Sequence, residues 1–318
     1  MKWVKLGLLF DPHEHRLPDG CTSFAQSPQA LVFDDFVRIY FSTRRHDGDG
    51  QYLSYISYVD VDREMRTVLR TAVAPVMPLG GLGCFDEHGI FPINVVRNGA
   101  EVRAYTCGWS RRVSVPVETA IGLAISHDRG ATFERVGPGP VMGPAPDEPF
   151  LVGDPFVVID DGRWHMWYIH GTSWAPAGPT ERGPARVYKV AHAESRDGRS
   201  WRRDGRRIIA DRLGDDECQA LPTVFACDGR WHMYFCYRYA TDFRANQSRG
   251  YRLGYAYSDD LVQWTRDDAA AGIDVSASGW DSEMQCYPHV FWCGAHVYML
   301  YNGNAFGRGG FGVARLER

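Results

Sequence analysis

The chain has 318 residues, a formal net charge of −4 and 13% aromatic residues. Charges of both signs are mixed along it and no long basic run occurs, which argues against a nucleic-acid partner. The apolar run at the N-terminus is too short and too interrupted for a secretory signal, and no segment approaches the length of a membrane span. Eight scattered cysteines without a Cys-x-x-Cys pair predict reduced, buried thiols. We therefore expect a cytoplasmic protein that binds neither nucleic acid nor membrane.

Two sequence markers recur along the chain with one period. The first is a proline that opens a short apolar run: Pro28, Pro92, Pro155, Pro222 and Pro288, spaced 63 to 67 residues apart. The second is an aromatic residue in the following strand, with similar spacing: Tyr40, Tyr105, Tyr168, Phe235 and Tyr301. A long repeat of short strands is typical of radially arranged sheets, which bury their faces only against each other. The sequence predicts an all-β, five-bladed β-propeller with about four antiparallel strands per blade, as a single domain over residues 1–318.

Each repeat predicts the same succession of strands. The first four blades contain residues 27–33, 36–44, 52–61 and 67–73; then 91–96, 101–109 and 120–136; then 154–159, 164–172 and 187–203; then 221–226, 231–239 and 251–266. The fifth blade, with residues 287–292, 297–304 and 311–318, lacks an outer strand. The apolar residues of segment 2–10 alternate, so we expect this N-terminal strand to close the last blade and remove two open sheet edges.

A short Ser/Asp motif recurs near the end of three repeats, at residues 126–133, 195–201 and 258–264. The first copy, Ser-His-Asp-Arg-Gly-Ala-Thr-Phe, resembles the Asp-box hairpin of sialidases and other propellers. Ser and Asp side chains in such turns bond to nearby backbone amides, and the aromatic residue packs beneath the hairpin. We interpret these motifs as structural.

The residues just before the repeated prolines should line the propeller axis, where the innermost strands converge. Immediately before the prolines stand Ser27, Phe91, Asp154, Leu221 and Tyr287, and five places before them stand Ser23, Glu87, Phe150, Glu217 and Glu283. Carboxylates that converge on one pocket raise one another's pKa, so that one stays protonated beside an ionised neighbour. Cleavage of a glycosidic bond uses such a pair. The alternative is that each acid caps a turn or binds an arginine.

These residues resemble the motifs of the five-bladed glycosidases, chiefly glycoside hydrolase families 43 and 32. Gly153-Asp154-Pro155 is similar to their third-blade Asp-Pro motif, and Glu217-Cys218 is similar to the Glu-Cys motif of family 32. The Ser-Asp-Asp-Leu-Val-Gln-Trp turn at 258–264 matches a hairpin common in both families. The resemblance implies a glycosidase with Glu217 as general acid, Asp154 as its orienting partner, and Glu283 or Glu87 as base.

One departure from these families concerns the first blade. They carry an Asp before the first-blade proline, as general base or nucleophile, and this chain has Ser27 there. Asp11, Asp19, Glu87 or Glu283 could replace it. A more distant resemblance is to family 130, whose phosphorylases use bound phosphate in place of a protein nucleophile. Arg44, Arg238, Arg244 and Arg308 follow inner or second strands and suit phosphate or a sugar carboxylate.

The remaining candidates are expected to bind substrate. The predicted substrate-binding residues are Asp86, His88, Arg44, Trp109, His170, Arg238, Tyr287 and Arg308. No metal-ligand spacing such as His-Glu-x-x-His occurs, so we predict neither a metal nor a cofactor. The sequence thus favours a glycoside hydrolase acting on an intracellular oligosaccharide or polysaccharide precursor, with a carbohydrate partner that is neutral, anionic or accompanied by phosphate. A phosphate-dependent phosphorylase and a non-catalytic carbohydrate-binding propeller are the alternatives.

Overall fold

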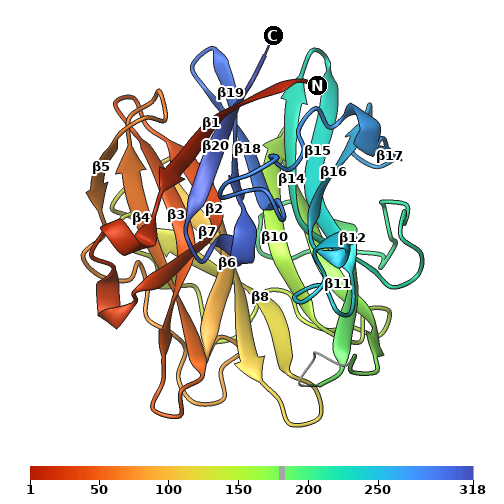
Figure 1. Ribbon diagram of the computed structural model, residues 1–318. Coiled ribbons are helices and arrows are strands. Elements are labelled where there is room, and N and C mark those ends of the chain that lie inside the picture. The colour runs from red at the N-terminus through yellow and green to blue at the C-terminus, as the bar shows by residue number, and fades with distance from the viewer. Residues whose placement is uncertain (179–182, 318) are drawn as a thin grey trace.

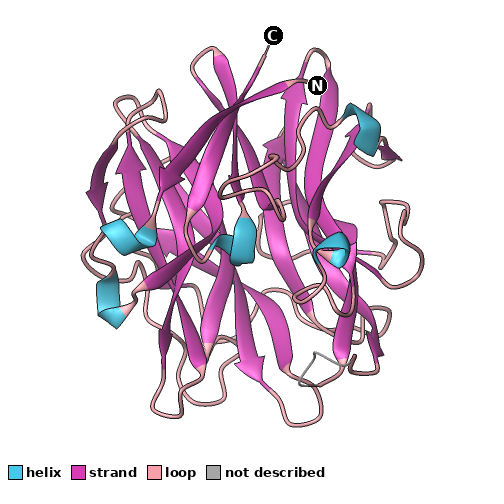
Figure 2. Cartoon of the chain, in the orientation of Figure 1, coloured by secondary structure: helices cyan, strands magenta, loops and turns pink. Residues whose placement is uncertain are grey.

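The computed structural model describes residues 1–178 and 183–317 and is built almost entirely of β-strands (Figure 1). The first strands are β1 (Trp3–Phe10), β2 (Ser23–Val32), β3 (Val37–His46), β4 (Tyr52–Val61), β5 (Val68–Thr71), β6 (Gly89–Asn98), β7 (Glu101–Arg111), β8 (Val117–Ser126), β9 (Glu134–Arg135) and β10 (Val152–Asp160). They are followed by β11 (Arg163–Ala175), β12 (Ala185–Ser195), β13 (Arg202–Arg203), β14 (Glu217–Cys227), β15 (Arg230–Tyr239), β16 (Arg252–Ser258), β17 (Thr265–Arg266), β18 (Cys286–Cys293), β19 (His296–Asn302) and β20 (Phe311–Leu316). Helical segments are confined to short turns at Pro12–Glu14, Pro18–Gly20, Gln247–Arg249, Asp268–Ala270 and α1, Asn304–Gly307 (Figure 2).

The strands pair almost entirely antiparallel, within sheets that follow chain order. Strands β10–β13 and β14–β17 form two four-stranded sheets, and a third has the order β1-β20-β19-β18. The remaining strands form one larger sheet, in which β2–β5 and β6–β9 are joined by the single parallel pair Ser54 and Gly89. The all-β, antiparallel prediction is confirmed.

The N-terminal strand pairs with the C-terminal one, as predicted. Strand β1 runs antiparallel to β20, with Trp3 opposite Leu316, and Figure 1 shows the red and blue ends of the chain side by side. Along β1, Trp3 and Phe10 are buried, whereas Leu6 and Leu8 are exposed. The alternation of the strand therefore leaves Val4, Leu6 and Leu8 on the surface. A shift of the pairing register between Leu8 and Phe10 returns Phe10 to the core.

The first strand of each repeat lies at the centre of the molecule. Strands β2, β6, β10, β14 and β18 contact one another in a closed ring, with β18 returning to β2. This arrangement is that of a β-propeller. The five repeated aromatic residues predicted from the sequence are fully buried in the core: Tyr40, Tyr105, Tyr168, Phe235 and Tyr301. Two of their hydroxyls donate to a turn of the following repeat, Tyr40 to the Gly130 carbonyl and Tyr105 to the Gly198 carbonyl, both at 2.7 Å.

The repeated prolines mark a bulge in each central strand. The pairing register shifts at this place in β2, β6, β10, β14 and β18. In four of them the residue before the proline has a left-handed backbone: Ser27, Asp154, Leu221 and Tyr287, with φ between 48° and 57°. A bulge leaves a residue outside the ladder and redirects its side chain. The bulges therefore release these side chains from regular pairing at the centre of the fold.

The three Ser/Asp motifs are turns held by their own side chains, which confirms their structural interpretation. In the second and third copies, the aspartate accepts two backbone N–H bonds: Asp197 from Arg199 and Ser200, and Asp260 from Val262 and Gln263, at 2.8 to 2.9 Å. These bonds satisfy amides that the hairpin leaves without a strand partner.

All eight cysteines are free thiols and seven of them are buried, in agreement with the sequence prediction. Among the described residues, no helix has the length and apolar character that crossing a membrane requires.

Candidate active site

Asp154 is the one carboxylate among the five residues that precede the repeated prolines. Its side chain is 7% exposed, and its Oδ2 accepts a hydrogen bond from the Leu221 amide of β14 at 3.3 Å. Burial raises the pKa of Asp154 to about 7, although the Leu221 amide and the nearby Arg186 guanidinium act in the opposite direction. A carboxyl with such a pKa is suited to donate or accept a proton near neutral pH.

Four arginines lie near one another and form what we term the arginine cluster: Arg44 of β3, Arg186 of β12, Arg238 of β15 and Arg244 of the following loop. One of them, Arg186, also lies near Asp154. Burial lowers the pKa of the Arg44 guanidinium, and the charges of Arg244 and Arg186 lower it further. The pKa of Arg244 is lowered in the same way, by burial and then by Arg238 and Arg186. Mutual repulsion of this kind favours an anion among the guanidinium groups.

Aromatic rings hold the arginine cluster in place. The Arg238 guanidinium lies 3.6 Å from the centre of the Phe243 ring and donates to the Tyr188 hydroxyl at 2.8 Å. Arg44 lies 5.0 Å from the centre of the Phe24 ring. Stacking on rings positions a guanidinium without neutralising it. Within the described chain, the Nε atoms of Arg44 and Arg238 are buried without a hydrogen-bond partner. The cluster therefore retains unsatisfied donors that an anionic ligand can use.

Tyr287 links the cluster to the central ring. It is buried and its ring meets Phe91 of β6 at 5.3 Å and Tyr251 at 5.6 Å, edge to face in both cases. Its hydroxyl is among the groups that oppose the lowered pKa of Arg44 and Arg244. The predicted site residues Arg44, Asp154, Arg238 and Tyr287 are thus brought together by the structure.

Glu217 requires a correction, because the structure does not leave it free for a substrate. Its side chain is fully buried. Oε1 accepts from Arg266 Nη1 at 2.6 Å and from Gln219 Nε2 at 2.9 Å. Oε2 accepts from the backbone amides of Arg212 and Leu213 at 2.8 and 2.9 Å. Both oxygens are thus occupied by donors of the protein, one of them cationic, so this geometry leaves neither oxygen free for a substrate.

The other predicted acids also lie outside the arginine cluster. Glu283 is exposed, and its backbone is held by Asn304 and Arg252. Glu87 is half-buried and accepts from the Gly83 amide of its own loop at 3.0 Å. Asp86 is buried against Arg135 at 2.5 Å. The expected pair of mutually repelling carboxylates is therefore wrong for Asp154, since its raised pKa comes from burial and its charged neighbour is Arg186.

The upstream candidates are held elsewhere as well. Asp11 contacts His13 at 2.7 Å, and Asp19 lies 3.6 Å from Arg45. Two surface cavities, of about 770 and 430 Å³, are lined by β1, β20 and their neighbours and by residues 12–22 with Val73. Neither cavity contains one of the four predicted catalytic carboxylates.

The remaining predicted binding residues differ in their positions. His88 stacks with Trp109 at 6.0 Å, at the start of β6, and its carbonyl accepts from the Ser54 amide. Because Ser54 pairs with Arg44 on β3, this pair lies on the same side of the sheet as the arginine cluster. The exposed Arg308 lies 6.0 Å from the Phe24 ring that also contacts Arg44.

His170 is buried on β11, and both of its ring nitrogens lack a partner among the described residues. Burial lowers its pKa to about 4, and its charged neighbours are Arg207 and Arg203. It is therefore a neutral ring near the outer strand of its sheet, apart from the arginine cluster.

Arg186 and Tyr188 are the site residues that the sequence did not single out, whereas Arg244 was among the arginines expected to suit phosphate or a sugar carboxylate. Arg186 ends the long Pro- and Gly-rich segment 171–186 of the sequence. A segment of this length and composition in a compact domain is a sequence signal for function. Residues 179–182 of that segment lie outside the described part of the chain. Tyr188 is recognisable only through its contacts, with Arg238 at 2.8 Å and with the Tyr251 hydroxyl at 2.9 Å.

No protein-family model matches the chain. Among solved structures it is similar to a protein named "Glycoside hydrolase", with a TM-score of 0.73 and 16% identity over 99% of this chain and 91% of that one. It is also similar to a thermostable family-43 glycoside hydrolase, with a TM-score of 0.66, 14% identity, and 95% and 93% of the two chains covered. The β-1,2-mannobiose phosphorylase of Listeria innocua, in complex with β-1,2-mannobiose, gives a TM-score of 0.68, 14% identity, and coverage of 98% and 96%. At these identities the likeness establishes the fold alone, a β-propeller that the chain shares with these proteins.

Two full-length relatives come from Mycobacterium tuberculosis, the uncharacterized protein MT1551 of strain CDC 1551 / Oshkosh and the uncharacterized protein Rv1502 of strain ATCC 25618 / H37Rv. Each is 35% identical over 323 residues, and the alignments cover 100% of both chains. This chain, with its β-propeller fold, therefore belongs to the same family as MT1551 and Rv1502.

Proposed function

We propose that this chain is a glycoside hydrolase that cleaves a glycosidic bond in a carbohydrate bearing a negative charge. The observation that carries the proposal is the position of Asp154, a buried carboxyl with a pKa of about 7, beside the arginine cluster. The likeness to glycoside hydrolase folds supports the reaction class.

Each group has a distinct chemical role in this proposal. Protonated Asp154 donates its proton to the leaving oxygen as the glycosidic bond breaks, and water supplies the oxygen of the new hydroxyl group. Arg44, Arg238 and Arg244 bind the anionic group of the substrate, and Tyr287 offers a ring face for a sugar. The four donors around Glu217 occupy both of its oxygens, so in this proposal it contributes to the stability of β14 rather than to proton transfer.

Phosphorolysis is the second candidate, and the composition of the site favours it specifically. The arginine cluster supplies several cationic donors and no second carboxylate acts on Asp154. An inorganic phosphate held by the arginines would form the new bond to the anomeric carbon while Asp154 protonates the leaving oxygen. The solved β-1,2-mannobiose phosphorylase shares the fold.

The number of blades and the single domain are also part of the proposal. We count β2–β5 and β6–β9 as separate blades, since one residue pair joins them, which gives five blades in a single domain over residues 1–318. The cytoplasmic location and an intracellular substrate stay predictions, which fractionation of the native cells would test.

The test is a substrate panel of matched neutral and anionic nitrophenyl glycosides and short oligosaccharides, each assayed with and without phosphate. We expect turnover of an anionic substrate, and a loss of about 10²–10⁴ in kcat for Asp154→Asn, the size typical of general acid catalysis. Asp160→Asn, an exposed aspartate at the other end of β10, is the matched control and should keep full activity.

Further variants separate the outcomes. Arg244→Gln should raise KM for the anionic substrate while leaving a neutral analogue unaffected. A strict requirement for phosphate would assign phosphorolysis in place of hydrolysis. Sugar binding without turnover would overturn the enzyme proposal in favour of a binding propeller. Unchanged turnover in Asp154→Asn would remove Asp154 from the mechanism.

A further inference from the structure

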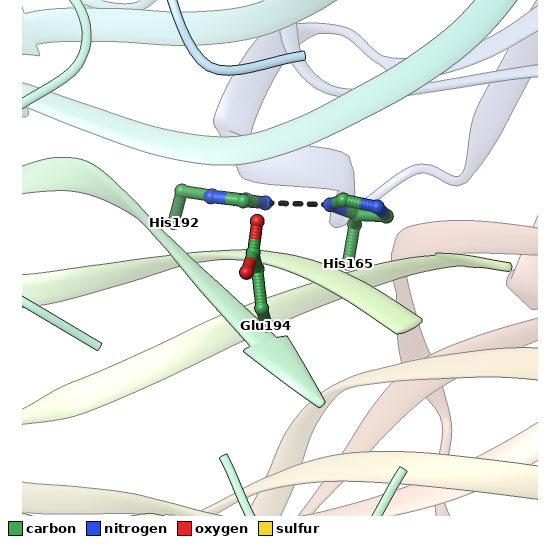
Figure 3. Close-up of side chains that lie close together, drawn as sticks. All are labelled: His165, His192 and Glu194. Carbon is green, nitrogen blue, oxygen red and sulfur yellow. Dashed lines mark hydrogen bonds between the residues drawn. The ribbon is translucent and has the colours of Figure 1, made fainter. Parts of the chain in front are cut away.

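We call β10–β13, the sheet of the third repeat, the third sheet, and β14–β17, the sheet of the fourth repeat, the fourth sheet. Two histidines and a glutamate meet on the outer part of the third sheet, away from Asp154. His165 lies near the start of β11, and His192 and Glu194 lie on β12. His165 pairs directly with Glu194 and Trp167 pairs with His192, so all three side chains project from the same face of the sheet. Figure 3 shows the Glu194 carboxylate directed toward the gap between the two rings.

The distances match those of a metal site. His165 Nδ1 and His192 Nε2 are 3.1 Å apart, and the potential ligand atoms of the three residues all lie within 4.8 Å of one another. Two imidazole nitrogens bound to one tetrahedral Zn²⁺ at about 2.0–2.1 Å would be about 3.3 Å apart. The two rings therefore already lie at the separation that one ion requires, and Glu194 needs only a side-chain adjustment.

The chemistry of the three side chains agrees with this geometry. His165 is buried and His192 is half-buried, and an imidazole nitrogen that carries no proton offers a lone pair to a metal ion. Among the described residues Glu194 has no ion-pair partner, and its charge faces both rings. Asp160 lies near His165 and Asp204 near His192, where ligating histidines commonly have a carboxylate neighbour.

The fourth sheet provides an internal comparison. The sequence Arg-Trp-His-Met begins both β11 and β15, which places His232 where His165 lies in the third sheet. The positions of Glu194 and His192 are occupied there by Tyr257 and Tyr255. His232 is satisfied by the Tyr255 hydroxyl at 2.7 Å and the Cys227 carbonyl at 3.1 Å. One fold position thus carries a closed hydrogen-bond network in one sheet and three potential metal ligands in the other.

We propose that β11 and β12 carry a binding site for a divalent transition-metal ion, best matched by Zn²⁺, with His165 Nδ1, His192 Nε2 and a Glu194 carboxylate oxygen as ligands. Two imidazoles and one carboxylate are a donor set that Zn²⁺ accepts, with a fourth position for water or an external ligand. In binding, the ion takes the place of the hydrogen bond between the rings: the ring that donates in this bond changes tautomer, so that both rings carry their proton on the outer nitrogen and offer the inner lone pair to the ion. The site does not depend on the proposed hydrolase activity.

The test is metal binding by the full chain, first stripped with a chelator and then dialysed against Zn²⁺ alone. We expect one Zn²⁺ per chain by elemental analysis and a rise in the melting temperature on adding Zn²⁺, because an ion that binds the folded chain stabilises it. Co²⁺ in place of Zn²⁺ should give the visible absorption of a tetrahedral site.

The decisive variant is His192→Tyr with Glu194→Tyr, which gives β12 the residues that β16 carries at the same places and so should fold. It should lose both the bound Zn²⁺ and the thermal shift. Glu194→Gln alone should weaken binding by at least about tenfold. His232→Gln and His13→Gln are controls that should bind as the wild type does. Absence of stoichiometric Zn²⁺ from the wild-type chain, or its retention by the double variant, would overturn the proposal.

Discussion

The third and fourth sheets share one backbone plan and differ in the chemistry that they carry. Strands β11 and β15 start with the same four residues, and in both sheets the tryptophan of that start pairs with the serine of the following turn. At the bulge, however, the third sheet has Asp154 and the fourth has Leu221. The outer face differs likewise, with His192 in one sheet and Tyr255 in the other.

This difference shows how a repeated scaffold separates stability from function. The fourth sheet fills its positions with rings and apolar side chains, which stabilise the fold through burial. The third sheet places titratable groups at the same positions, where burial is unfavourable to charge and changes the pKa. The polar positions of the third sheet are therefore the stronger candidates for function.

The largest expected effect concerns the ion pair that an arginine of the last strand in each sheet forms with a buried glutamate. Arg266 of β17 pairs with Glu217 at 2.6 Å, and Arg203 of β13 pairs with Glu148 at 2.7 Å. Arg266→Met leaves the buried Glu217 without its cationic partner, so we expect a loss of about 3–5 kcal/mol in the free energy of unfolding. Arg203→Met should cost less, because burial already raises the pKa of Glu148 and protonation relieves it. Urea unfolding of both variants measures the difference, and equal losses would contradict it.

The second effect is a pH dependence that the third sheet has and the fourth lacks at the bulge. The pKa of Asp154 is raised to about 7 in the folded chain, above its unfolded value of about 3.9. The folded state thus binds the proton more tightly. The contribution of Asp154 to the free energy of unfolding is fully present below pH ~4 and is lost as pH rises through ~7. Relative to Asp154→Asn, the wild type should lose up to about 4 kcal/mol over this range.

The comparison with Asp154→Asn is needed because other groups act in the opposite direction. Burial lowers the pKa of His170 and His192 to about 4, so their contribution to stability is present above pH ~6.5 and is lost at lower pH. Denaturant unfolding at pH 4, 5.5 and 7 measures both chains. A difference between them that is constant with pH would contradict the prediction.

A smaller effect is expected from changes in side-chain packing at matched positions of the two sheets. Gly254 pairs with Phe235 in the fourth sheet, and Ala191 pairs with Tyr168 in the third. A Cβ added at Gly254 would lie 2.4 Å from the Phe235 ring, so Gly254→Ala should cost about 1–3 kcal/mol through overpacking. Ala191→Gly should cost only about 0.5–1 kcal/mol, from added backbone freedom. Thermal unfolding of the two variants checks the order, which a tolerated Gly254→Ala would reverse.

The smallest effect concerns the feature that the two sheets share. Asp197 and Asp260 each accept two backbone N–H bonds in the same type of turn. Asp197→Ala and Asp260→Ala should therefore lower the melting temperature by nearly equal amounts, equivalent to roughly 1 kcal/mol. A clearly larger loss for one turn would show that the two hairpins are not equivalent.

Local features of the sequence were sufficient to predict much of the fold. The period of prolines and aromatic residues predicted the repeat, the alternation in segment 2–10 predicted the pairing of β1 with β20, and the Ser/Asp motifs predicted their turns. Asp154, Arg44, Arg238 and Tyr287 were also identified, because each lies beside a repeated strand. These features depend on neighbouring residues or on a regular period, so the sequence contains them directly.

The tertiary structure decided which charges meet. Alignment by the prolines placed Glu217 and Glu283 in equivalent positions, yet one is buried beneath Arg266 and the other is exposed. Glu217 is the first residue of β14, whereas Glu283 lies in the loop before β18, and the Arg266 partner of Glu217 comes from a strand dozens of residues away. The pKa of Asp154, the convergence of the arginines and the meeting of His165 with His192 depend in the same way on burial and on contacts across strands. Sequence period determines where a strand lies, but only the folded chain determines which charges are buried together and which remain in water.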